Sequence, residues 1–245
     1  KHSVKNSLDQ MLLTTYTYPE ITASTNDVIR SMVNKNIISP ILEEKEQSNP
    51  LPTGSNIWDL AGKKVEYGAF ILGSNTLYLP SKLYELNTLG YSSEYTLADE
   101  VLSYSTLGNP REVVSKDGIH TVYLWGYGDR YLIAEIKNAT HSQVSAAVSS
   151  VFGMTVDALS QAVTPDATHL SNLRNNVNLN GAFVSTFTHE PLVGVTSMTE
   201  PSGRTTYYVY DNLSRLIESY YYEDNIVSTA NKRTLNQYYY HNINQ

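Results

Sequence analysis

The sequence predicts a mainly β protein, a meander of antiparallel hairpins with a small helical insert around residues 140–177 and one short helix near residues 26–34. Short runs of β-branched and aromatic residues, the types that strands favour, recur along most of the chain. Glycine, proline, asparagine and aspartate separate these runs at hairpin spacing. The chain also has 20 Tyr against 4 Phe. Tyrosine suits a pleated surface, on which its ring packs while its hydroxyl reaches water or a polar partner.

The amino-terminal part is expected to hold two strands and the short helix. A β-branched and aromatic run over residues 10–18 stops at a proline and predicts the first strand. Thr25 is placed to cap the helix over residues 26–34. A second strand is predicted over residues 37–46. The turn-forming residues that follow indicate a loop over residues 48–62.

From residue 64 the predicted strands follow one another closely. Asp117-Gly118 separates two alternating runs, which is a strong short-range hairpin signal. The strands expected before the helical insert span residues 65–72, 76–79, 94–104, 111–115, 120–127 and 131–136. The strands expected after it span residues 182–188, 194–200, 204–210, 215–223 and 234–240.

The helical insert is predicted from its caps. Thr140 and Gln143 match a capping box, and Thr155 is placed to cap a second helix. Pro165 would take the first position of a third helix over residues 166–176. Because the apolar faces are narrow, we expect the insert to cap an edge or end of the sheet. We therefore divide the chain into four segments of one continuous β structure: amino-terminal strands with a short helix (1–62), a first hairpin repeat region (63–138), the helical insert (139–180) and a second hairpin repeat region (181–245).

The two hairpin regions contain a degenerate repeat. Residues 118–125 and 203–210 align so that a turn glycine is followed by threonine three residues later and by aromatics at five and seven. Such repetition is typical of stacked supersecondary units. The expected structural residues of the motif, with the corner that follows the second copy, are Gly118, Thr121, Tyr123, Trp125, Gly203, Thr206, Tyr208, Tyr210, Asp211 and Arg215.

The second copy resembles the YD repeat of the RHS family, which has a Tyr-Asp pair followed by Gly-Arg within a hairpin. Residues 203–216 carry this pattern with Tyr210-Asp211, but Ser214 stands where the family usually has glycine. Residues 117–127 and 191–197 also look like the RHS-like proteins of Bacteroidota. The resemblance implies a curved sheet of YD-repeat type, in which hairpins wind into a shell on a secreted or cell-surface protein. We expect the chain to be a fragment of such a longer polypeptide.

The corner of this repeat has a physical explanation. Asp211 can accept backbone N–H bonds in an Asx-type turn, and the glycine position supplies a positive φ. Arg215 can pair with Asp211 or stack on a tyrosine. These roles are structural.

Composition and motifs exclude several classes of function. A net charge of −7 with scattered basic residues argues against nucleic-acid binding. Zero cysteines exclude thiolate catalysis and cysteine-ligated metals, and no stretch is apolar enough to span a membrane. His189-Glu190 begins like a helical zinc motif, but Pro191 follows it. We expect no enzyme, no catalytic or metal-binding residue and no cofactor.

The predicted function is therefore a structural β-repeat segment of a secreted or cell-surface RHS-like protein, with further repeats of the same polypeptide as its partner. An alternative is a surface module that binds a glycan or a protein through exposed tyrosines, since aromatic platforms suit such contacts. Its expected face is Tyr220, Tyr222, Tyr238 and Tyr240. A second alternative is an unrecognised hydrolase.

Overall fold

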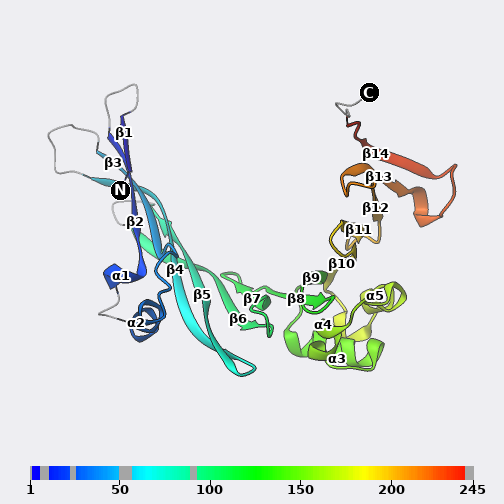
Figure 1. Cartoon of the computed structure of the whole chain (residues 1–245), viewed down its shortest axis with the longest axis horizontal. Helices are drawn as coiled ribbons and strands as arrows, with labels where there is room; N and C mark the ends of the chain where they lie inside the picture. Colours follow the sequence, from blue (N-terminus) through cyan, green and yellow to red (C-terminus); the bar gives the residue numbers. More distant parts are fainter. Residues whose placement is uncertain (1, 6–10, 23–25, 50–56, 89–92, 241–245) are drawn as a thin grey trace. The chain divides into compact units, whose positions relative to one another are not determined.

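The computed structural model describes residues 2–5, 11–22, 26–49, 57–88 and 93–240. The chain divides into two compact units, Lys1–Gly118 and Ile119–Gln245. Within each unit, each strand pairs antiparallel with the next strand along the chain (Figure 1). The predicted mainly β meander, with its short helix and helical insert, is confirmed. The four-segment division stays a prediction.

The elements of the first unit are β1 (His2–Lys5), β2 (Met11–Thr17), α1 (Pro19–Thr22), α2 (Asp27–Asn34), β3 (Glu43–Asn49), β4 (Trp58–Leu72), β5 (Asn75–Asn87), β6 (Glu94–Tyr104) and β7 (Pro110–Ser115). The strands of the second unit are β8 (His120–Gly126), β9 (Tyr131–Lys137), β10 (Phe183–Glu190), β11 (Gly194–Thr199), β12 (Thr205–Tyr210), β13 (Leu216–Tyr222) and β14 (Lys232–Gln237). Its helices are α3 (His141–Phe152), α4 (Val156–Gln161) and α5 (Ala167–Arg174), with short 3₁₀ turns at Val177–Leu179 and Glu223–Asn225. Among the described residues, no helix is long and apolar enough to cross a membrane.

The β4–β5 hairpin is longer than predicted. Residues 58–62, expected to be a loop, belong to β4, while residues 50–56 lie outside the described part of the chain. β5 continues past Pro80 because a bulge accommodates the proline: Tyr67 pairs with Pro80 and Glu66 with Lys82, so Ser81 has no opposite residue. The Ser81 hydroxyl donates to the Glu66 carbonyl at 3.1 Å.

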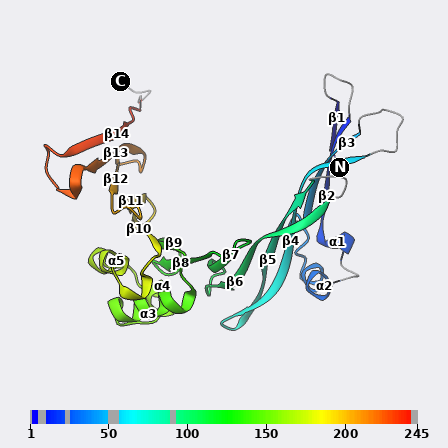
Figure 2. The same cartoon turned by 180° about the vertical axis from the view of Figure 1, so that it is seen from behind.

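Helix α2 packs on this hairpin and forms the core of the first unit (Figure 2). Its N-cap is Asn26, whose side chain accepts from the backbone N–H groups of the second and third helical residues at 2.8 and 3.2 Å. The predicted cap, Thr25, lies outside the described residues. Ile29 and Met32 are buried against Leu42, with Tyr67 packed beside them. The predicted strand over residues 37–46 begins only at Glu43, after the segment that supplies Leu42 to this core.

The helical insert builds the core of the second unit. Figure 1 shows α3, α4 and α5 gathered beside β8 and β9. The expectation that the insert caps an edge or end of the sheet is wrong, because its three short apolar faces together cover one face of β8–β10. The fully or almost fully buried residues that meet there are Val122, Leu124, Ile133, Ile136, Val144, Ala147, Val148, Leu159, Leu170, Leu173 and Val184. Burying each larger aliphatic side chain is worth about 1.5–3 kcal/mol.

The helix caps follow the sequence closely. The Thr140–Gln143 capping box forms, and Thr155 accepts from the Ala158 N–H at 3.1 Å. The third helix differs: its cap is Asp166, which accepts from the His169 N–H at 2.9 Å. The predicted role of Pro165 at the first helical position is therefore wrong, because the proline precedes the cap.

Candidate functional site

The corner between β12 and β13 carries the Tyr-Asp part of the repeat motif. One carboxylate oxygen of Asp211 accepts from the backbone N–H groups of Leu213 and Arg215, both at 2.9 Å. The other accepts from the Arg215 guanidinium at 2.7 Å. Hydrogen bonds from the Arg215 backbone and side chain lower the pKa of Asp211. Ser214, at the position where the YD repeat usually has glycine, has a left-handed φ of +58°. Asp211 thus binds two backbone N–H groups of its own turn and pairs with Arg215. That both residues belong to a repeat motif stays a prediction.

The remaining motif residues lie in turns and strands. Gly118 and Gly203 have φ of +74° and +93° in the turns before β8 and β12. Thr206 is buried in β12, and Thr121 is half-buried in β8. Tyr123 and Trp125 of β8, and Tyr208 of β12, are half-buried on their strands.

Tyr210 reaches across the neighbouring strand. Its hydroxyl donates to the Val195 carbonyl of β11 at 3.0 Å. Gly194 leaves room for the ring, because a Cβ at that glycine would lie 2.5 Å from the Tyr210 hydroxyl. The motif tyrosine thus ties β12 to β11, in keeping with a structural role.

Three tyrosines form a ring cluster on one face of β12 and β13. Tyr220 stacks on Tyr207 at 5.4 Å between centroids and meets Tyr222 edge-on at 5.5 Å. Tyr207 also meets Tyr222 edge-on at 5.6 Å. Tyr207 is not among the face residues predicted from the sequence. Counting back from the hairpin corner at Asp211 gives the register of β12 and β13, which places Tyr207 opposite Tyr220. That register was the signal that could have identified Tyr207.

The other predicted face residues lie beyond the last strand. β14 ends at Gln237, so the prediction of a strand to residue 240 is wrong. The Tyr240 ring lies 4.4 Å from the Arg215 guanidinium, and its hydroxyl donates to the Leu216 carbonyl at 2.9 Å. Tyr238 is 44% exposed. Tyr240 therefore covers the Asp211 corner, whereas Tyr220 and Tyr222 belong to the ring cluster.

A lysine–glutamate pair adjoins the ring cluster. The Lys232 ammonium lies 4.1 Å from the Tyr220 ring centroid and 2.8 Å from a Glu218 carboxylate oxygen. The hydrogen bond from Lys232 lowers the pKa of Glu218. Burial, followed by the hydrogen bond with Tyr222, raises the pKa of Tyr220. Tyr220 is therefore protonated at neutral pH and offers its hydroxyl as a hydrogen-bond group.

A polar groove of about 630 Å³ lies between α5 and the face of β10–β12, and Tyr207 lines it. The strand hydroxyls in its lining come from Thr186, Thr188, Ser197, Thr199 and Thr205. No feature of the sequence predicted this groove.

Arg174 holds α5 beside this groove. Its guanidinium donates to the carbonyls of Thr199 and Pro201, each at 3.2 Å, and to that of Glu200 at 2.5 Å. It also donates to the Val184 carbonyl of β10. Burial lowers the pKa of Arg174. Its charge is thus directed at backbone carbonyls of β10 and of the β11–β12 turn.

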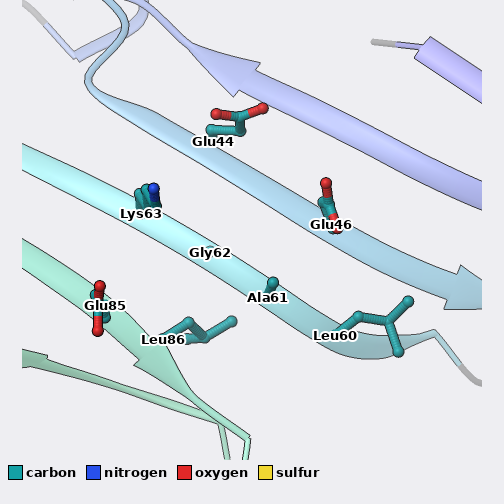
Figure 3. Close-up of a pocket in the computed structure, with 8 residues that line it drawn as sticks. All are labelled: Glu44, Glu46, Leu60, Ala61, Gly62, Lys63, Glu85 and Leu86. Atoms are coloured by element: carbon teal, nitrogen blue, oxygen red, sulfur yellow. The ribbon is translucent and has the colours of Figure 1, made fainter. Parts of the chain in front are cut away.

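Two hollows lie among the described residues of the first unit. One has a volume of about 370 Å³. Figure 3 shows Glu44 of β3 and Glu85 of β5 on the strands to either side of Lys63 of β4, and Glu46 farther along β3 beside Ala61. Three carboxylates and one ammonium in this lining repel anionic ligands. Among the described residues, no three carboxylate or imidazole side chains are grouped so that they could hold a metal ion.

The second hollow, of about 400 Å³, lies beside α2. There the Tyr95 hydroxyl donates to a Glu43 carboxylate oxygen at 2.8 Å. Burial, followed by this hydrogen bond, raises the pKa of Tyr95. This hydrogen bond connects β6 to β3, so the polar groups of Tyr95 and Glu43 are used in stabilising the sheet.

The sequence matches no family model and no curated protein. The solved structures similar to this chain include "Crystal Structure of TcdB2-TccC3-Cdc42" and "Crystal Structure of TcdB2-TccC3 without hypervariable C-terminal region". Each has 8% sequence identity and a TM-score of 0.38 to this chain. The alignments cover 92% and 95% of this chain, which spans 11% of the length of the matched chain in both cases.

Proposed function

We propose that the chain is a non-enzymatic structural segment of a secreted or cell-surface RHS-like protein, in which hairpins add strand by strand to a shell or scaffold. Further repeats of the same polypeptide would be its partner. The observation that carries this proposal is that the side chains of the Tyr-Asp corner make their hydrogen bonds within the sheet itself. Asp211 and Arg215 bind each other and the backbone of their own turn, and Tyr210 binds the next strand.

The strand order supports the same role. In each unit the sheet order follows the chain order, so a hairpin rests mainly on the hairpins next to it in sequence. Structures of this kind grow by adding units at the end of a sheet. Strand β14, with five of its six residues exposed, is a place where a further strand could add.

The alternative function, a surface that binds a glycan or a protein, is supported by one observation. The rings of Tyr207, Tyr220 and Tyr222 form a cluster on a partly accessible face of β12–β13. Tyrosine clusters of this type are common at binding surfaces because they offer contact area at low entropic cost.

Electron cryomicroscopy of the polypeptide as the cell makes it tests the scaffold proposal. We expect the outer edge of β14 to pair with a further strand and the Tyr-Asp corner to recur along the sheet. A solvated β14 edge at the end of an isolated sheet would contradict the proposal.

The role of the corner is tested separately with Asp211→Ala, for which Asp117→Ala is the matched control at another exposed turn. We expect Asp211→Ala to lower the melting temperature and to speed amide exchange in β12 and β13. The control should melt like the wild type. Equal melting of both variants would remove the corner as the support of the proposal.

A further inference from the structure

We propose that the groove between α5 and β10–β12 binds a short, uncharged oligosaccharide. The inference depends on the alternative binding function and not on the scaffold role. It places the site at the groove rather than at the tyrosines predicted from sequence. The groove volume of about 630 Å³ lies within the range of about 300–1,000 Å³ that is typical of small-molecule sites.

The hydroxyls of the groove have hydrogen-bonding capacity beyond their contacts with one another. The Thr199 and Thr205 hydroxyls are 2.9 Å apart, so one donates to the other. Because each hydroxyl has one proton and two lone pairs, the accepting hydroxyl keeps its own proton. The Thr188 hydroxyl lies 2.6 Å from that of Ser197 and 2.8 Å from that of Thr196. These three hydroxyls have three protons and make two hydrogen bonds with one another, so one proton is left for a ligand. A sugar, whose hydroxyls both donate and accept, matches such a mixed row.

The charge of the groove indicates an uncharged ligand. Of the residues that line it, Arg174 is the one with a charged side chain, and four backbone carbonyls already accept its hydrogen bonds. An ammonium on the ligand would therefore lose water without gaining an opposite charge, and a carboxylate or sulfate would meet a guanidinium whose hydrogen bonds already go to backbone carbonyls. Both cases are costly. A neutral polyol has no such cost.

The aromatic side of the groove is Tyr207. Tyr220 covers one face of this ring from the β13 side, whereas the groove lies toward β11, where Ser197 pairs with Tyr207. Stacking on Tyr220 holds the ring in place, so little entropy is lost when a ligand packs on it. The C–H face of a sugar ring is apolar and packs on aromatic rings, while its hydroxyls point away toward polar groups. Tyr207 and the hydroxyl row thus offer the two kinds of contact that a sugar ring makes.

The test begins with an array of neutral gluco-, galacto-, manno- and xylo-oligosaccharides beside sialylated and sulfated glycans, followed by calorimetric titration of the strongest neutral hit. The double variant Thr199→Val/Thr205→Val removes both partners of one hydrogen bond and keeps their shape, which is nearly neutral for stability. We expect it to raise the Kd about tenfold. Tyr207→Leu should have at least the same effect, whereas Tyr208→Leu, on the same strand with its side chain on the opposite face, should change the Kd less than twofold.

Three outcomes would overturn the proposal. The first is no saturable binding of any neutral oligosaccharide, and the second is binding confined to charged glycans. The third is binding that Tyr222→Leu abolishes and that Thr199→Val/Thr205→Val leaves unchanged. This third result would keep the binding surface and reject the groove. In all three cases the scaffold proposal would stand on its own tests at β14 and Asp211.

Discussion

The hydroxyl of Tyr127 binds both backbone groups of His189. It accepts from the His189 N–H at 3.0 Å and donates to the His189 carbonyl at 3.1 Å. The pairing of β10 with β9 ends at Thr186, so this hydroxyl takes the place of a strand partner for the residues beyond it. Tyr127 can do so because it lies in the β8–β9 turn with a left-handed φ of +56° and a buried ring.

Tyr127→Phe tests this contact. The variant removes one hydroxyl and leaves two partly buried backbone groups of His189 without their partner. We therefore expect the free energy of unfolding to fall by about 1–3 kcal/mol, measured by urea denaturation at neutral pH. Tyr131→Phe is the matched control. Its hydroxyl accepts from the Leu192 N–H at 3.1 Å, but Leu192 is 93% exposed, so water can replace that bond. A loss in the control as large as in Tyr127→Phe would refute the role of Tyr127.

His189 also predicts a pH dependence. Its ring packs on Tyr131 at 5.0 Å and edge-on against Tyr127 at 5.7 Å, and burial lowers its pKa below 6.5. As the pH falls below 6.5, His189 becomes protonated in the unfolded chain but stays neutral in the folded chain. The free energy of unfolding should therefore fall from about pH 7 until the lowered pKa is passed, and then level off for this group.

The measurement is a series of urea denaturations between pH 8 and pH 5 for the wild type and for His189→Gln. The glutamine does not titrate, so the slope between about pH 7 and pH 5.5 should flatten in the variant. Asp211 and Glu218, with lowered pKa values, begin to lose their stabilising contribution only as the pH falls into the ordinary carboxyl range at about 4, and they lose the rest below it. An unchanged slope in His189→Gln would assign the pH dependence to other groups.

The hairpins were predictable because most of their signals are local. The limits of β6 match the prediction, and the Thr140 capping box forms as expected. Strand β5 was predicted to stop before Pro80, because a proline usually ends a strand unless a bulge accommodates it. The bulge opposite Glu66 depends on the register of the partner strand. That register cannot be predicted from the residues of β5 alone.

The groove was not predictable for a similar reason. Thr188, Ser197 and Thr205 are ordinary strand residues when read one strand at a time, and only pairing places them on one face beside α5. Tyr238 and Tyr240 were expected to share one face of a last strand over residues 234–240, but alternation predicts a common face only within a strand, and β14 ends at Gln237. The corner was the most predictable part of the site, because Asp211 and Arg215 act within one turn.

Ser214→Gly should stabilise the protein. A residue with a Cβ is strained at the left-handed φ of +58° that this corner requires, and glycine is not. We expect a gain of about 0.5–1 kcal/mol in the free energy of unfolding, measured by thermal and urea denaturation. Ser74→Gly is the control at an exposed turn position without a positive φ. At that position glycine relieves no strain and only raises the conformational entropy of the unfolded chain, so the free energy of unfolding should stay equal or fall. A loss in Ser214→Gly would show that the Ser214 side chain supports the corner.

Arg174→Met should loosen the insert from the sheet. The methionine keeps much of the apolar stem but leaves the carbonyls of Thr199, Glu200 and Pro201 without the guanidinium. We expect a loss of about 2–3 kcal/mol and faster amide exchange in α5 and in the β11–β12 turn. Arg174→Lys should recover only part of the loss, because one ammonium cannot span carbonyls of β10 and of the turn at the same time. Arg130→Met, at an exposed turn position, should stay within about 0.5 kcal/mol of the wild type. If lysine restored full stability, the planar fork of Arg174 would not be what holds α5 over the groove.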